Sequence, residues 1–317
     1  MAQWLKKSVG YLIVATALVW VLHDVHPRDL AEALIVQYPA WLALAVAADI
    51  LSYVMQAIRW RLFLTPVGQL STRRATQAIY AGLFVNEIVP MRLGEVVRAY
   101  LAARWMPARF TSVLTTLAFE RFTDGVWLIV GAGVAAAFVR LPADLIRTAK
   151  ILGVLLFSLM ALMLILARFG RCATRGRLNR AARTIRSATT APAFWLAILS
   201  SSLVLLLQTL AFWFVIKAYA LPFYFWTGAV VFLIVRLGTA IPNAPANVGT
   251  FQFFVVAGLT FFGLDKSTAA AFSVAVFVVL TVPLWLIGFF ALSRTGLTLD
   301  KIRLGIGEQA TAALEPR

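Results

Sequence analysis

Residues 86–95 read NEIVPMRLGE, and residues 242–249 read PNAPANVG. Each stretch interrupts a longer apolar segment, 75–105 in the first case and 225–262 in the second. Proline removes a backbone N–H donor and disfavours helix at the residue before it. Non-helical backbone at membrane depth is tolerated only where protein or a water-filled cavity surrounds it. Both segments are therefore predicted to form broken helical hairpins whose tips lie inside the protein.

The two interruptions share a short motif. Pro90-Met91-Arg92-Leu93-Gly94 matches Pro245-Ala246-Asn247-Val248-Gly249 at an offset of 155 residues. The repeat halves are predicted to span roughly 38–138 and 191–292, with one hairpin entering from each side of the membrane. Such an inverted repeat is the organisation of many secondary transporters. The predicted hinges are Pro90, Gly94, Pro242, Pro245 and Gly249.

The chain around the hairpins is too apolar to cover itself in water. Of its 317 residues, 62% are hydrophobic and 13% are charged, whereas a soluble domain has about 45–50% and about 25%. The mean hydropathy is +0.87. This composition excludes a soluble enzyme, a nucleic-acid-binding domain and a disordered protein. Long continuous apolar runs also differ from the short alternating segments of a β-barrel.

The prediction is an all-α polytopic membrane protein. About 20 apolar residues cross a bilayer as a helix. Six segments are predicted to cross, together with the two hairpins, in a single domain over 1–292 that is followed by a cytoplasmic tail over 293–317. The six segments are roughly 8–23, 38–58, 111–138, 149–168, 191–216 and 267–292.

The net charge of +16 is explained by basic loops, so no nucleic-acid partner is predicted. The segments before the first crossing, after the second, in the loop 168–190 and in the tail hold 17 Lys and Arg, whereas the opposite side holds six. Arg59 is counted here as a residue that follows the second crossing. The positive-inside rule then places both termini in the cytoplasm. The seven arginines of the loop 168–190 are predicted to set this topology and to contact anionic lipid.

Polar residues concentrate at the hairpins, although a charge inside a membrane segment costs about 2.5–3.5 kcal/mol on insertion scales. Arg92 and Arg98 are predicted to bind a phosphate or another anionic headgroup, because the planar guanidinium pairs with such oxygens. The carboxylates are predicted to hold these arginines or to carry protons. The alternative is a closed ion-pair network that pins hairpin to bundle without a ligand. The predicted substrate-binding residues are Asn86, Glu87, Arg92, Glu95, Arg98, Glu120, Arg121, Asp124, Arg236, Asn243, Asn247 and Gln252.

Other polar residues give weaker signals. Asp49 stands alone in the second crossing, as either a structural acceptor or a site residue. His23 and His26 flank Asp24, but the chain has no further histidine and its one cysteine is Cys172, so no metal site and no internal disulfide are predicted. No nucleotide-binding loop, HExxH or Gly-x-Ser-x-Gly motif occurs. No cofactor and no enzymatic activity are therefore expected.

Four motifs together resemble the lysylphosphatidylglycerol synthase transmembrane-region family, over roughly 40–290. They are Arg59-Trp60-Arg61-Leu62-Phe63-Leu64, the segment 86–98, Glu120-Arg121-Phe122-x-Asp124 and Pro242-x-x-Pro245-x-x-x-Gly249. The resemblance implies a flippase-like domain in a bacterial inner membrane. In the multiple peptide resistance factors this domain moves aminoacylated phosphatidylglycerol between leaflets and is fused to a synthase.

This chain departs from that pattern in two ways. It ends at Arg317, so a stand-alone member without the synthase is expected. It also has Gln252 where relatives often have a glutamate, so no proton-linked role is expected there.

Three functions remain open from the sequence. The first is an ATP-independent translocase for a lipid with a polar or anionic headgroup, such as an aminoacylated phospholipid, a hopanoid or a polyprenyl-linked lipid. The second is a scaffold that holds lipid-biosynthesis enzymes of an envelope-lipid pathway, for example that of hopanoids. The third is an intramembrane glycosyl transferase that uses Glu120 and Asp124, the one close carboxylate pair. Membrane lipids are the expected partners in each case, and the sequence predicts no oligomeric state.

Overall fold

The computed structural model of this chain describes residues 16, 19–21, 35–89, 93–140, 146–147, 151, 153–155, 157–158, 161, 192–240 and 245–296. The predicted crossings 8–23 and 149–168 lie largely outside these residues, as do the loop 168–190 and most of the tail. His23, Asp24, His26 and Cys172 are also outside them.

Four long helices carry the described part of the fold, which contains no strand. They are α3 (Pro39–Leu64), α6 (Phe110–Phe138), α9 (Pro192–Ala218) and α12 (Lys266–Ser293). Each is long and apolar enough to cross a membrane. Four of the six predicted crossings are thus present as helices, and the all-α polytopic class is confirmed.

One predicted boundary is wrong. The second crossing was expected to end at residue 58, but α3 continues to Leu64. Arg59 therefore lies within the helix, where it is fully buried, and does not belong to the basic residues of a loop. Hydropathy ends a crossing at its first charges, whereas the helix continues because neighbouring helices supply polar partners for those charges.

Both broken hairpins are present. The first consists of α4 (Thr72–Ile88) and α5 (Gly94–Trp105). The second consists of α10 (Phe225–Gly238), the short 3-10 helix η2 (Pro245–Asn247) and α11 (Thr250–Phe261). The hinge residues Pro90 and Pro242 lie outside the described residues.

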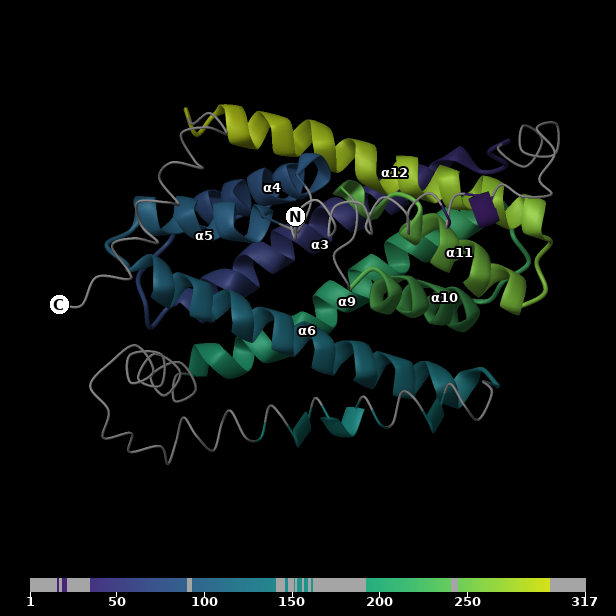
Figure 1. The fold of residues 1–317 in the computed structure, drawn as a ribbon, viewed down its shortest axis with the longest axis horizontal. Helices are drawn as coiled ribbons and strands as arrows, with labels where there is room; N and C mark the ends of the chain where they lie inside the picture. The colour runs from purple at the N-terminus through teal and green to yellow at the C-terminus, as the bar shows by residue number, and fades with distance from the viewer. Residues whose placement is uncertain are drawn as a thin grey trace, which may run out of the picture.

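The two halves of the chain repeat one order of elements: a long helix, a broken hairpin and a second long helix. α3 and α9, the first long helix of each half, pack side by side through the centre. Figure 1 shows the hairpin α4–α5 at one end of the long axis and the hairpin α10–α11 at the other. The halves are therefore arranged in opposite senses, and η2 meets α4 between them.

Local contacts close the first hairpin. The backbone N–H of Gly94 donates to Oδ1 of Asn86, with 2.7 Å between the atoms. A Cβ atom on Gly94 would lie 1.8 Å from the carbonyl oxygen of Gly82. A side chain at this position would collide with backbone, so glycine is required for α4 and α5 to approach this closely.

The second hairpin turns with unusual backbone. Ala246 and Asn247 have φ of 57° and 52°, and Gly249 has φ of 81°. Non-glycine residues in this left-handed region are uncommon and cluster at functional sites. The N–H of Gly249 donates to Oε1 of Gln252 at 2.7 Å, so a side-chain amide closes this hairpin as Asn86 closes the first.

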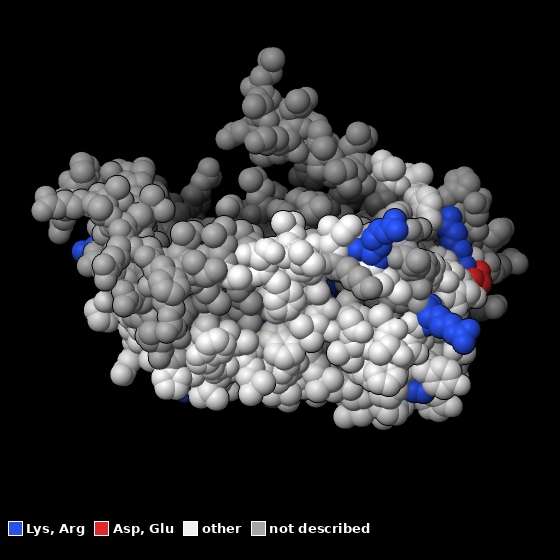
Figure 2. Space-filling view, turned by 90° about the horizontal axis from the view of Figure 1, so that it is seen from below, with Lys and Arg blue, Asp and Glu red and all other residues white. Residues whose placement is uncertain are grey.

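The surface is suited to lipid. On the face shown in Figure 2, white side chains cover much of the middle, most of the visible Lys and Arg and the visible acidic atoms lie toward one end, and a few basic atoms appear at the other end. Large apolar side chains such as Leu199, Leu286 and Phe290 are exposed. Exposed apolar surface of this kind is expected where a protein contacts hydrocarbon, and the polar groups then collect inside the bundle.

Candidate functional site

Glu120 of α6 is the centre of a buried cluster of charges. Its side chain is fully buried. Its Oε1 accepts hydrogen bonds from Nη2 of Arg59 and from Nε2 of Gln56, both at 2.7 Å. Its Oε2 accepts a hydrogen bond from Nη2 of Arg98. One carboxylate thus joins α3, α5 and α6.

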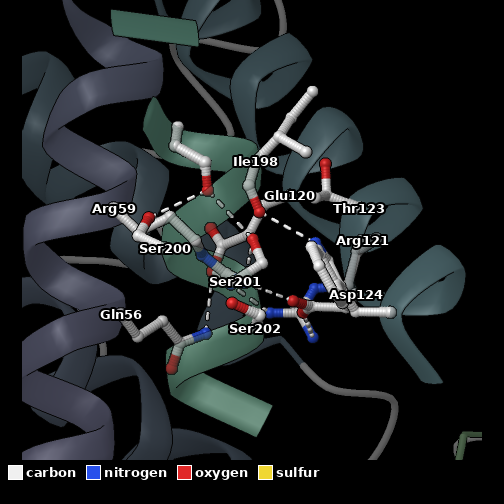
Figure 3. Close-up of polar contacts among 12 residues, drawn as sticks. Gln56, Arg59, Glu120, Arg121, Thr123, Asp124, Ile198, Ser200, Ser201 and Ser202 are labelled. Atoms are coloured by element: carbon white, nitrogen blue, oxygen red, sulfur yellow. Dashed lines mark hydrogen bonds and ion pairs between the residues drawn. The ribbon is translucent and has the colours of Figure 1, made fainter. Parts of the chain in front are cut away.

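Arg59 extends the cluster to a fourth helix. Its Nη1 lies 2.5 Å from Oδ1 of Asp124 on α6 and 3.0 Å from the hydroxyl of Ser201 on α9. Figure 3 shows Gln56 and Arg59 reaching from α3 toward the acidic residues of α6 and the serines of α9. A buried arginine with two carboxylate partners is the arrangement that compensates the cost of removing its charge from water.

Arg98 and Arg121 complete the cluster. The guanidinium of Arg98 lies 4.1 Å from the ring centroid of Trp60, a cation–π contact. The side chain of Arg121 is 38% exposed, and it forms ion pairs of 3.3 Å with Asp124, 3.4 Å with Glu95 and 3.7 Å with Glu120. Three arginines and three carboxylates therefore share one network.

A polar cavity of about 170 Å³ lies beside this cluster, between the hairpin tips. Such a volume holds several water molecules. The first hairpin contributes Asn86, Glu87 and Glu95 to its wall, and η2 contributes Asn247. Both hairpins thus present polar groups to the same space, which is the arrangement expected for backbone that is broken at membrane depth.

A second cavity of about 20 Å³ lies between α3, α6, α9 and α10, next to Arg59 and Asp124. Gln56 of α3, Gln208 of α9 and Arg236 of α10 line both cavities. These three residues, named the septum below, lie where the space at the hairpin tips adjoins the space at the ion-pair cluster.

The structure separates the predicted site residues into groups. Glu87, Glu95, Arg98, Arg121, Arg236, Asn86 and Asn247 line the main cavity. Glu120 and Asp124 lie in the ion-pair cluster, where both bind Arg59. Gln252 closes the second hairpin. Arg92 and Asn243 lie outside the described residues.

Several residues of the site were missed by the sequence reasoning. Arg59, Gln56, Ser201 and Gln208 belong to the cluster or to the cavity walls. On α3 a signal was available, because Asp49, Ser52, Gln56 and Arg59 recur every three or four residues and so share one helix face. On α9 nothing in the sequence distinguishes Ser201 from its neighbours Ser200 and Ser202.

The fold and the cavity define the class of the protein. It is an all-α polytopic membrane protein with a charged cavity between two broken hairpins, which lie at opposite ends of the long axis. The family model of the lysylphosphatidylglycerol synthase TM region matches residues 8–288. The chain belongs to this family, and the resemblance seen in the sequence is confirmed. A comparison with curated proteins found none that matches the chain.

Proposed function

We propose that the protein is an ATP-independent lipid translocase. It would move a lipid with a polar or anionic headgroup, such as an aminoacylated phospholipid, a hopanoid or a polyprenyl-linked lipid, between the leaflets of a bacterial inner membrane. Both termini would lie in the cytoplasm, as the basic loops indicate. The observation that carries this proposal is the charged cavity between the tips of the two hairpins.

A headgroup that crosses hydrocarbon needs polar partners along its route, because leaving water without them costs several kcal/mol. The cavity offers amides, carboxylates and guanidinium groups inside an otherwise apolar bundle. The acyl chains would stay in the surrounding lipid, against the exposed apolar side chains.

The inverted arrangement of the hairpins supports a way to alternate access. In transporters with inverted repeats, one repeat rocks against the other around a fixed midplane site. Here the hairpins enter from opposite ends and η2 contacts α4. Rocking one hairpin against the other would open the cavity first to one leaflet and then to the other.

The test is lipid exchange in proteoliposomes without ATP. Purified protein should accelerate the transfer of a fluorescent phospholipid between leaflets above the rate in protein-free vesicles. Leu83 lines the cavity, so Leu83→Trp should fill part of it and slow transfer by about tenfold or more. Leu286 is 58% exposed on α12, so Leu286→Trp is a matched control that should transfer lipid at the parent rate.

Two results would contradict the proposal. One is a parent protein no faster than empty vesicles, which would leave the scaffold function as the better account. The other is a Leu83→Trp variant that folds and transfers lipid between the leaflets as fast as the parent does.

A further inference from the structure

The arginines of the ion-pair cluster are already neutralised. Arg59, Arg98 and Arg121 each contact at least one carboxylate, and the three acidic partners match them in number. Arg98 and Arg121 line the cavity, but an anionic ligand that bound them would compete with these carboxylates, and displacing Glu120 would leave a buried charge unpaired. These ion pairs join α3, α5 and α6, and they make the cluster a less favourable anion site than an arginine without an ion-pair partner.

Arg236 differs from these arginines. It lies in the last turn of α10 and lines both cavities. Its guanidinium forms no ion pair and no hydrogen bond with any other described residue. Among the described residues no carboxylate forms an ion pair with Arg236, although the buried Asp49 of α3 lies close enough to interact electrostatically with its charge.

Gln208 is a second and independent sign of a ligand. It is only 7% exposed, and it lines both cavities beside Arg236. Within the described part of the chain its amide has no hydrogen-bond partner. The amide is not among the fully enclosed polar groups that lack a partner, because it borders the cavities, so a group that enters the cavity can form hydrogen bonds with it.

From these observations, and on the basis of the proposed function, we propose that Arg236 binds the phosphate of the transported lipid and that Gln208 donates a second hydrogen bond to it. The septum is then the point that the headgroup crosses between the two cavities. Gln56 is held in the septum by its bond to Glu120, so the ion-pair cluster positions one wall of the anion site.

The same geometry specifies the substrate class. A guanidinium fork and a neutral amide match the unesterified oxygens of a phosphodiester, which carries one negative charge. A diphosphate would bring further negative charge next to Glu87 and Glu95, which line the same cavity. The substrate inferred is therefore a monoanionic phosphodiester lipid, as opposed to a polyprenyl diphosphate or an uncharged lipid.

The experiment compares two fluorescent lipids in the proteoliposomes described above: phosphatidylglycerol, a monoanionic phosphodiester, and an uncharged glycolipid. The parent should transfer phosphatidylglycerol faster than the glycolipid. Arg236→Gln should slow phosphatidylglycerol by about tenfold or more, and Arg236→Lys should slow it less because the charge is kept. Arg61, exposed at the end of α3, supplies the control Arg61→Gln, which should match the parent.

Folding is controlled separately. Arg236→Gln should melt at the parent temperature, because its side chain holds no other described residue. If Arg236→Gln does not fold, Gln208→Leu removes a hydrogen-bonding amide from the septum without changing its charge. This variant should slow the transfer of phosphatidylglycerol by at least severalfold. Uptake of radiolabelled inorganic phosphate by the parent should equal that of protein-free vesicles, since the phosphate must belong to a lipid.

The outcomes distinguish this inference from the proposed function. If Leu83→Trp blocks transfer but folded Arg236→Gln and Gln208→Leu transfer phosphatidylglycerol at the parent rate, the cavity is the route and Arg236 is not the phosphate site. Equal parent rates for both lipids, or uptake of free phosphate, also overturn the inference. A parent that transfers neither lipid overturns the proposed function itself.

Discussion

Substitution of Glu120 by glutamine tests whether the ion-pair cluster holds the helices together. Glutamine keeps the size of the side chain but replaces the carboxylate that Arg59, Arg98 and Gln56 all contact. Breaking a buried pair by removing one partner costs about 3–5 kcal/mol, because the other charge stays buried and uncompensated. We expect Glu120→Gln to lower the free energy of unfolding by about this amount.

The magnitude comes mainly from Arg98. Arg59 keeps its 2.5 Å bond to Asp124 in the variant. Arg98 has Glu120 as its one carboxylate partner among the described residues, and it would keep only the ring of Trp60. In the variant the buried guanidinium of Arg98 would contact an aromatic face but no anion. We therefore expect the loss of unfolding free energy to lie near the upper part of the range of about 3–5 kcal/mol.

Arg121 supplies the comparison. Its side chain is 38% exposed and its ion pairs are 3.3–3.7 Å long. Exposed pairs contribute about 0–1 kcal/mol; Glu120 and Asp124 are largely buried, but the longer pairs of the partly exposed Arg121 are expected to lie nearer this range than the pair of Arg98. Arg121→Gln should therefore stay within about 1 kcal/mol of the parent, although it removes a charge from the same network.

The assay is reversible unfolding in detergent micelles, followed by helix content against denaturant. A double variant Glu120→Gln with Arg98→Gln should be more stable than the sum of the two single losses predicts, because the pair is removed together. The reasoning is refuted if Glu120→Gln unfolds within about 1 kcal/mol of the parent, or if Arg121→Gln is the more damaging change.

Three further predictions address packing, pH and topology. Gly94→Ala should prevent folding or strongly reduce the amount of protein in the membrane, because its Cβ would lie 1.8 Å from a carbonyl oxygen of α4; Gly133→Ala, where a Cβ meets nothing within 4 Å, should be normal. Asp265 caps α12, and hydrogen bonds from the side chain and backbone of the third helical residue lower its pKa. The cap's contribution, about 1 kcal/mol, should be present above the ordinary aspartate pKa and be lost as the pH falls through the lowered value, so the difference between parent and Asp265→Ala should shrink in acid. Single cysteines at Arg73 and Tyr224, in a background without the native cysteine, should react with an impermeant thiol reagent from opposite sides, with Arg73 cytoplasmic; labelling of both from outside would contradict the topology.

The architecture was largely predictable because the membrane imposes one-dimensional rules. A crossing needs about 20 apolar residues, and broken backbone must be enclosed. Both rules can be applied to the sequence directly, so the four described crossings and the two hairpins were found within a few residues. The exception is the end of α3, where Arg59 looks like the beginning of a loop until its partners on α6 and α9 are known.

The sequence predicted most residues of the candidate site by type, and the roles that it assigned to them stay predictions. The sequence indicated that charges gather at the hairpins, and it treated Arg98 as a headgroup ligand. The structure places Arg98 against Glu120 and Trp60. Arg98 also lines the cavity, so both the closed network and the role of Arg98 as a headgroup ligand stay predictions. Arg236 received no special weight, since its lack of a described partner is visible only in three dimensions.

The sequence by itself determined the class of the protein, its helical spans and its two interruptions, because hydrophobicity and proline act locally along the chain. Only the tertiary structure decided which charges neutralise one another and which face the cavity. Glu120 lies 61 residues from Arg59 and 22 from Arg98, and the pairing depends on how four helices cross. Electrostatic compensation inside a membrane is a property of that crossing, so the same charged residues give either a scaffold or a binding site according to their neighbours in space.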